Sequence, residues 1–228
     1  MTTVLITGAN RGLGLALAQQ YAADGAEVIV CCREPARADA LKELAASFGD
    51  RVRIMQLDVA DESSITSLKR MLADKPIDIL INNAGINGLS VNEIEAEGWM
   101  TTMRVNALAP MLIAQALRDN LRRGSEKKLV AIASILGSTS SAGGGKYAYR
   151  ASKAALNNGM RALSRDWASD GILVGILNPG WARTKMGGDD GFISPEESAR
   201  GLISRIAELT PATSGVFQDY RRGVTIRW

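Results

Sequence analysis

The sequence predicts an α/β fold, a single doubly wound domain whose parallel sheet of about seven strands is covered by helices on both faces. Along the whole chain, short apolar runs of strand length alternate with longer amphipathic segments. Such alternation is typical of strand-helix-strand units that build a parallel sheet. A chain of 228 residues, 46% of them apolar, suffices for one large core but is short for two. We therefore expect one domain over residues 1–228.

The elements follow from these runs in order. The predicted strands are residues 4–7, 27–32, 52–57, 77–82, 129–134 and 173–178, with a last run near Val216. The predicted helices are residues 12–24, 36–48, 63–72, roughly 99–121, 147–168 and 195–208. Gly25 ends the first helix, and Ser194 to Glu197 form a capping box with Pro195 at the first helical position. The expected strand order extends the 3-2-1-4-5-6 arrangement by a seventh strand.

Composition excludes several classes of function. Lys and Arg number 27 against 24 Asp and Glu and are scattered, so no nucleic-acid partner is expected. The first apolar run begins at residue 4 and no apolar stretch is long enough to span a bilayer, so we expect a cytoplasmic protein without a membrane partner. Cys31 and Cys32 are adjacent in a strand, where they face opposite ways, and we expect buried free thiols.

The chain has no histidine. This absence removes Ser-His-Asp and Cys-His catalysis and the commonest zinc ligands, so no metal site is predicted and a serine hydrolase is disfavoured. Acid-base chemistry must therefore use tyrosine, lysine or carboxylates.

A glycine-rich turn lies between the first strand and the first helix. Its glycines, Gly8, Gly12 and Gly14, are spaced as a variant of the dinucleotide-binding fingerprint. Such a turn places backbone N–H groups and a helix amino terminus near a pyrophosphate, although any tight strand-to-helix turn can also use glycine. The candidate cofactor-binding residues of this turn are Gly8, Asn10, Arg11, Gly12, Leu13 and Gly14.

The end of the second strand indicates which dinucleotide is bound. Enzymes that use NAD place Asp or Glu there to bind the ribose hydroxyls, whereas this strand ends in Cys31 and Cys32 followed by Arg33. Arg33 and Arg11 could grip a 2′-phosphate through charge-assisted hydrogen bonds, or could simply be solvated surface charges. We expect NADP(H) rather than NAD(H).

Tyr149 and Lys153 stand four residues apart and so share one face of a helix. A nearby ammonium favours the ionised form of a phenol, whose ordinary pKa of about 10 is too high for useful base catalysis at neutral pH. The pair occurs together with the glycine-rich turn, Asn82 to Gly85, Asn106, Ser134, and Pro179, Gly180 and Thr184. With these motifs the sequence resembles the short-chain dehydrogenase/reductase family, which has a Rossmann-type fold, over essentially its whole length. Residues 178–188 and 214–228 are similar to its C-factor and carbonyl-reductase branch.

The resemblance implies a role for each motif. Tyr149 would be the general acid/base, Lys153 would bind the nicotinamide ribose and lower the tyrosine pKa, Ser134 would hydrogen-bond the reacting oxygen, and Asn106 would hold a proton-relay water. Asp58 and Val59 would flank the adenine, Asn83, Ala84 and Gly85 would line the cofactor, and Pro179, Gly180 and Thr184 would hold its nicotinamide end.

The choice of Ser134 rests on its position at the end of a predicted strand, where a hydroxyl is held rigidly, and on Gly137 three residues later. Its separation from Tyr149 is longer than the family pattern, and Ser138, Ser140 and Ser141 lie in between. Ser134 could also simply cap a neighbouring backbone group.

We expect an NADP(H)-dependent oxidoreductase that exchanges a hydride with a carbonyl or alcohol substrate, acting as a carbonyl reductase. The alternatives are a non-catalytic NADP(H)-binding redox sensor acting on a partner protein, and a sugar-nucleotide epimerase or dehydratase, for which the region after Lys185 is short. A hydrophobic substrate is suggested by Ile86, Leu136, Tyr147, Trp181, Met186 and Phe192, which could equally be core residues. The resemblance also implies a homo-oligomer, either a dimer or a tetramer, formed by the helices that carry Asn106 and Tyr149. On the second of these helices, apolar surface is offered by Leu156, Met160 and Leu163. Residues 224–228 are a second candidate contact.

Overall fold

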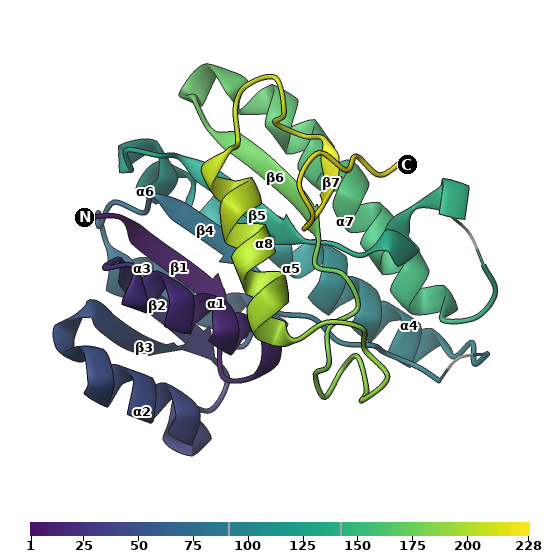
Figure 1. Ribbon diagram of the computed structural model, residues 1–228, viewed down its shortest axis with the longest axis horizontal. Helices are drawn as coiled ribbons and strands as arrows, with labels where there is room; N and C mark the ends of the chain where they lie inside the picture. Colours follow the sequence, from purple (N-terminus) through teal and green to yellow (C-terminus); the bar gives the residue numbers. More distant parts are fainter. Residues whose placement is uncertain (91, 142) are drawn as a thin grey trace.

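The computed structural model describes residues 1–90, 92–141 and 143–228 (Figure 1). In these residues seven strands form one parallel sheet with the order β3-β2-β1-β4-β5-β6-β7, which confirms the predicted fold class and strand order. The strands are β1 (Thr3–Thr7), β2 (Glu27–Cys32), β3 (Val52–Gln56), β4 (Ile79–Asn82), β5 (Lys128–Ile132), β6 (Leu173–Asn178) and β7 (Phe217–Asp219).

The inner strands are buried on both faces. Every residue of β1, β4 and β5 is buried, so successive side chains enter two different cores. Val4 and Ile6 of β1 belong to one core, whereas Leu5 belongs to the other. This is why these strands have continuous apolar runs instead of alternating apolar and polar residues.

Helices cover both faces of the sheet. Helices α1 (Gly12–Ala23), α2 (Asp39–Phe48) and α8 (Pro195–Ala207) pack against one face, and Figure 1 shows α1 and α8 crossing in front of the sheet. Helices α3 (Glu62–Leu72), α5 (Ala109–Ala116), α6 (Arg118–Arg123) and α7 (Tyr147–Asp166) pack against the other. Within the described ranges, no helix is long and apolar enough to cross a membrane.

The helix expected at about residues 99–121 is interrupted, and the expectation of one continuous helix is wrong. The segment consists of α4 (Ala96–Met103), a π-helical turn (Arg104–Leu108), α5 and α6. Pro110 offers a physical reason, because it has no N–H to donate to the carbonyl of Asn106 four residues earlier. In the π turn, Ala109 N–H instead donates to the carbonyl of Arg104, five residues back.

Several local predictions can be compared directly. The Ser194 side chain accepts a hydrogen bond from Glu197 N–H (3.1 Å), with Pro195 at the start of α8, as expected of the cap. Cys31 and Cys32 are buried free thiols, as expected. The expectation that Leu156 and Met160 offer surface for oligomer contacts is wrong, because both are buried in the core between α7 and the sheet.

Candidate active site

The predicted site residues lie in loops at one edge of the sheet. Because the strands are parallel, the loops that follow β1, β4, β5 and β6 all leave the sheet at its carboxyl edge. These loops carry the glycine-rich turn, Asn83 to Gly85, Ser134, and Pro179 to Thr184. Tyr149 and Lys153 lie in the first two turns of α7 and reach the same edge through contacts with the loop after β5.

The glycine-rich turn is packed so closely that side chains do not fit. Gly8 has a φ of +65°, and a Cβ at this position would lie 2.9 Å from Ala84 Cα. A Cβ at Gly14 would lie 2.5 Å from the Asn83 side-chain nitrogen, and one at Gly12 would lie 3.2 Å from Thr184 Cγ2. The turn therefore contacts the loops after β4 and β6 through bare backbone, as a phosphate-binding turn requires. Leu13 packs its side chain against the core.

Thr7, the last residue of β1, joins two of these loops. Its Oγ1 accepts hydrogen bonds from the N–H groups of Asn83 and Ala84, each at 3.0 Å. The Asn83 side chain returns two bonds, to the carbonyls of Thr7 (2.9 Å) and Gly8 (3.1 Å). Thr7 was not among the predicted site residues. Its position as a hydroxyl residue directly after the apolar run of residues 4–6 was the available signal.

The two arginines expected near a 2′-phosphate are exposed. Arg11 is the N-cap residue of α1, and Arg33 directly follows β2. Across the described ranges, neither guanidinium forms a side-chain hydrogen bond or an ion pair, whereas the neighbouring Glu34 pairs with Arg37 at 3.0 Å. Both arginines are therefore available to an anion near the end of β2.

Asp58 and Val59 follow β3 and form a tight turn. Asp58 Oδ1 accepts a hydrogen bond from Ala60 N–H (2.9 Å), and Asp58 N–H donates to Ser64 Oγ (3.0 Å). Val59 is partly buried against the core on the α3 side of the sheet. The turn is thus fixed in position beside the end of β2, to which β3 is paired.

Tyr149, Ser134 and Lys153 form a compact group. Tyr149 is partly buried, and the Ser134 hydroxyl lies close enough to its phenol to act on its pKa. Lys153 is buried, its Nζ lies 5.8 Å from the centroid of the Tyr149 ring, and it donates a 2.8 Å hydrogen bond to the carbonyl of Ile132. The predicted phenol, hydroxyl and ammonium are therefore brought together at the end of β5.

Burial dominates the electrostatics of this group. Burial raises the pKa of the Tyr149 phenol, and the nearby Ser134 hydroxyl acts in the opposite direction. Burial also lowers the pKa of Lys153 to about 8. The sequence led us to expect a lowered tyrosine pKa. In the protein alone it is raised, because the cost of placing a phenolate in this poorly solvated region outweighs the favourable interactions around it.

Asn106 lies in the π turn and is completely buried. Its Oδ1 accepts a hydrogen bond from Ile86 N–H (2.9 Å), and its Nδ2 donates to the Ile86 carbonyl (2.8 Å) and to Ser152 Oγ (3.0 Å). Ser152 Oγ in turn donates to the carbonyl of Tyr149 (2.7 Å). The Asn106 amide thus ties the loop after β4 to the tyrosine turn of α7. Ser152 was missed, although it stands between Tyr149 and Lys153 in the sequence.

Ser134 follows the end of β5 and caps a short 3₁₀ turn. Its Oγ accepts a 3.2 Å hydrogen bond from Leu136 N–H, and Ile135 N–H donates to Asn178 Oδ1 at 2.9 Å. The alternative Ser138 is engaged elsewhere, since its hydroxyl donates to the carbonyl of Arg227. The side chain of Ser141 lies outside the described part of the chain. Asn178, another residue not predicted for the site, fixes the backbone beside Ser134.

Apolar side chains are exposed near this edge. Trp181 and Phe192 form an edge-to-face pair with ring centroids 5.0 Å apart, and Phe192 is 79% exposed. The loop that carries them is tied to the loop after β4 by a 2.9 Å hydrogen bond from Asn87 Nδ2 to the carbonyl of Met186. Tyr147 and Met186 are also exposed. An apolar rim of this kind suits a hydrophobic ligand.

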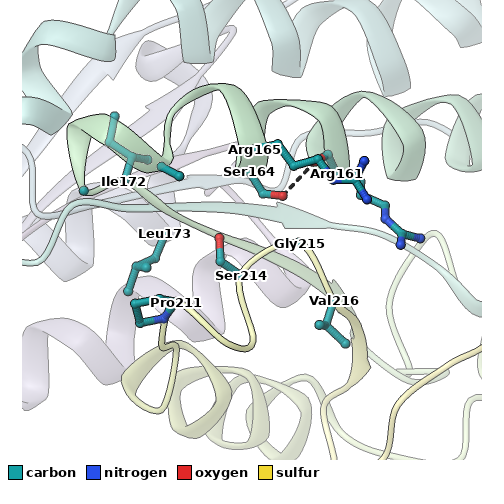
Figure 2. Close-up of a pocket in the computed structure, with 11 residues that line it drawn as sticks. Arg161, Ser164, Arg165, Ile172, Leu173, Pro211, Ser214, Gly215 and Val216 are labelled. Atoms are coloured by element: carbon teal, nitrogen blue, oxygen red, sulfur yellow. Dashed lines mark hydrogen bonds between the residues drawn. The ribbon is translucent and has the colours of Figure 1, made fainter.

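A hollow of about 400 Å³ lies elsewhere (Figure 2). It is bounded by the end of α7, the start of β6 and the segment before β7. Since the amino end of β6 points away from the carboxyl edge, this hollow is separate from the site described above.

Comparison with known proteins gives consistent matches. The family model described as short chain dehydrogenase matches residues 2–191. The C-signal protein of Myxococcus xanthus is 38% identical over 156 residues, which cover 67% of this chain and 93% of that protein. The structure of carbonyl reductase Sniffer of D. melanogaster matches with a TM-score of 0.90 and 28% identity over 100% of both chains. An NADPH-bound carbonyl reductase from chicken fatty liver matches with a TM-score of 0.90 and 30% identity, covering 100% of this chain and 99% of that one.

Proposed function

The chain belongs to the short-chain dehydrogenase family, and from that premise we propose that it is an NADP(H)-dependent carbonyl reductase. One observation carries the proposal. Tyr149, Ser134 and Lys153 form a compact group, with Lys153 buried and Tyr149 partly buried, beside a glycine-lined turn that could hold a dinucleotide. The carbonyl reductases among the similar structures, one of them NADPH-bound, support this choice of reaction and cofactor.

The residues present fit an NADP(H) molecule. The pyrophosphate would lie on the cradle of Gly8, Gly12 and Gly14, which a Cβ would fill, at the amino end of α1. Arg33 and Arg11 would bind the 2′-phosphate, and Asp58 and Val59 would flank the adenine. The loop after β4 and residues Pro179, Gly180 and Thr184 would hold the nicotinamide end. When bound, NADPH supplies the hydride to the carbonyl carbon.

The side chains of this chain would move the proton. The Tyr149 hydroxyl donates its proton to the carbonyl oxygen during reduction, while Ser134 holds that oxygen by a hydrogen bond. The raised pKa of Tyr149 keeps the phenol protonated, and therefore able to donate, across the neutral range. Lys153 would bind the ribose through the ammonium that now donates to Ile132. In the reverse direction Tyr149 must accept the proton, which requires positive charge nearby.

We extend the proposal to substrate and assembly. The exposed Trp181, Met186 and Phe192 favour a hydrophobic aldehyde or ketone. A homo-oligomer remains our prediction, now without Leu156 and Met160 at its interface. Exposed Met100 of α4 and Leu108 of the π turn are the apolar side chains that these segments offer instead.

The test is NADPH oxidation, followed by fluorescence, with a panel of aromatic and aliphatic aldehydes and ketones. Tyr149→Phe removes the hydroxyl and keeps the ring, so turnover should fall about 100-fold or more while NADPH affinity changes less than about twofold. Tyr21→Phe is the matched control. It removes a buried hydroxyl that has no hydrogen-bond partner among the described residues, near the far end of α1.

Near-normal turnover by Tyr149→Phe would show that this tyrosine is a packing residue and would refute the mechanism. Tight NADPH binding by the unmodified protein without oxidation by any carbonyl compound would instead favour the redox-sensor alternative.

A further inference from the structure

The last residues of the sequence fold back onto the loop that follows β5. Ser138 Oγ donates a 2.6 Å hydrogen bond to the carbonyl of Arg227, and Ser140 N–H donates a 2.9 Å bond to the backbone oxygen of Trp228. Ser138 is 2% exposed, and its hydroxyl also lies 3.0 Å from that of Ser140. Residues 224–228, which we call the tail, therefore contact the segment between Ser134 and Tyr149.

The tail is itself held firmly. Ile226 N–H donates to the Phe217 carbonyl (2.8 Å), and Asp219 N–H donates to the Val224 carbonyl (2.9 Å), so the tail runs antiparallel to β7. The Trp228 ring packs on Phe217 with centroids 5.8 Å apart. The guanidinium carbon of Arg161, on α7, lies 4.6 Å from the centre of the same ring. The tail thus connects β7 and α7, two rigid elements, to the loop after β5.

That loop sits directly against the catalytic group of the proposed function. A Cβ on Gly137 would lie 2.8 Å from the backbone carbonyl carbon of Lys153 and 2.9 Å from its Cβ, so loop and helix are in close contact. At its start the loop is held through Ile135 N–H, which donates to Asn178 Oδ1, while Asn178 Nδ2 donates to Asp219 of β7 (2.7 Å). One end of the loop is therefore fixed by Asn178 at the end of β6, which β7 holds through Asp219, and the other end is fixed by the tail that pairs with β7.

We propose that the tail, through Trp228 and the two backbone oxygens that bind Ser138 and Ser140, is a positioning element for the Ser134 and Tyr149 pair. The inference rests on the proposed carbonyl reduction. If the tail is displaced, residues 135–140 lose their second anchor and Ser134 can move relative to Tyr149. Displacement of a positioned group by about 1 Å can reduce turnover by about 100-fold, so even a small movement should be measurable.

The test compares three variants with the unmodified protein. Trp228→Ala removes the ring that packs on Phe217 and Arg161, Trp228→Phe keeps an aromatic ring there, and Arg227→Ala changes an exposed tail side chain while leaving its carbonyl in place. Hydrogen exchange of the amides of residues 136–140 is measured first. Trp228→Ala should accelerate it at least about 10-fold, whereas the other two variants should stay close to the unmodified protein.

Steady-state kinetics then separates positioning from general stability. In Trp228→Ala, kcat for the best carbonyl substrate should fall about 10-fold or more, with the Kd for NADPH within about twofold, and Trp228→Phe should restore kcat. Unchanged exchange in Trp228→Ala, or an unchanged kcat despite faster exchange, would overturn the inference.

Hydrogen exchange and NADPH binding can be measured without turnover. If the protein reduces no carbonyl compound, the proposed function is overturned. Hydrogen exchange still decides in that case whether the tail anchors the loop. If Trp228→Ala does not fold, Ser138→Ala removes a single hydrogen bond to the tail, and the same two measurements on it decide the matter.

Discussion

Replacing Lys153 by methionine should make the protein more stable at neutral pH although it removes a residue of the proposed mechanism. Lys153 is 5% exposed, and the hydrogen-bond partner of its Nζ in the described structure is the neutral carbonyl of Ile132. Methionine has a similar length and no charge, so it fills the space without the cost of burying an ammonium.

The size of the effect follows from the pKa. A fall from the ordinary pKa of 10.5 to about 8 corresponds to about 3 kcal/mol of folding free energy at pH 7. Loss of the hydrogen bond to Ile132 offsets about 1 kcal/mol, which leaves the variant about 2 kcal/mol more stable.

The sign depends on pH. Below the folded pKa of about 8, Lys153 is charged in both the folded and the unfolded protein, and the burial cost is present in full. As pH rises from about 8 towards 10.5, the folded protein loses this proton before the unfolded chain does, and the cost disappears. The unmodified protein should therefore regain about 2 kcal/mol relative to the variant between pH 7 and about pH 9.5.

The assay is urea unfolding followed by circular dichroism at both pH values. Lys69→Met, which changes an exposed lysine of α3, serves as the control and should show no pH-dependent difference. Cys31, whose pKa is raised by burial, is common to all three proteins and cancels in the comparison. Tyr149, whose pKa is raised by burial above its ordinary value of 10.0, stays protonated at both pH values. A difference between Lys153→Met and the unmodified protein that is equal at both pH values, or that grows with pH, would refute the reasoning.

Three further predictions concern cofactor and assembly. Arg33→Ala should weaken NADPH binding about 10- to 150-fold and spare NADH, as expected for one lost charge-assisted hydrogen bond; with Arg37→Ala as control, equal losses for both cofactors would contradict the 2′-phosphate assignment. Gly14→Ala should abolish NADPH binding measured by fluorescence, because the methyl group would meet the Asn83 side chain. The control Gly144→Ala, which has no described atom within 4 Å of the new methyl group, should bind NADPH normally. NADPH binding by both variants would argue against the glycine cradle. Light scattering at micromolar concentration should give the mass of a dimer or tetramer, and a monomer mass would exclude the predicted assembly.

The strands could be predicted closely because a parallel sheet buried on both faces needs unbroken apolar runs, and few other segments of this chain have them. The carboxyl edge followed from topology, so the grouping of Gly8, Asn83, Ser134 and Thr184 was predictable without any coordinates. The end of the fifth strand was predicted less accurately. The predicted strand continued to residue 134, whereas β5 ends at Ile132 and Ser134 caps the turn that follows.

What could not be predicted depends on long-range contacts. Leu156 and Met160 have the spacing of an apolar helix stripe, which fits a core face or an interface equally, and the packing of α7 against the sheet decides that this face is internal. Ser138, Asn178 and Asp219 are ordinary polar residues in the sequence. They become part of the support of the site only because β7 and the tail return beside β5 and β6.

The π turn at residues 104–108 limits how this chain can tolerate insertions and deletions. Each residue of an α-helix advances the side-chain direction by about 100°, and a π turn accommodates one residue more than regular helix does. Deleting one residue there would let the turn close to regular α-helix with α4 and α5 still facing as they do now, but it would change the direction of the residues inside the turn. Asn106 would then point away from Ile86 and Ser152, while Pro110 would still interrupt the hydrogen-bonding ladder. We therefore expect substitutions in this turn to be tolerated far better than any change in its length.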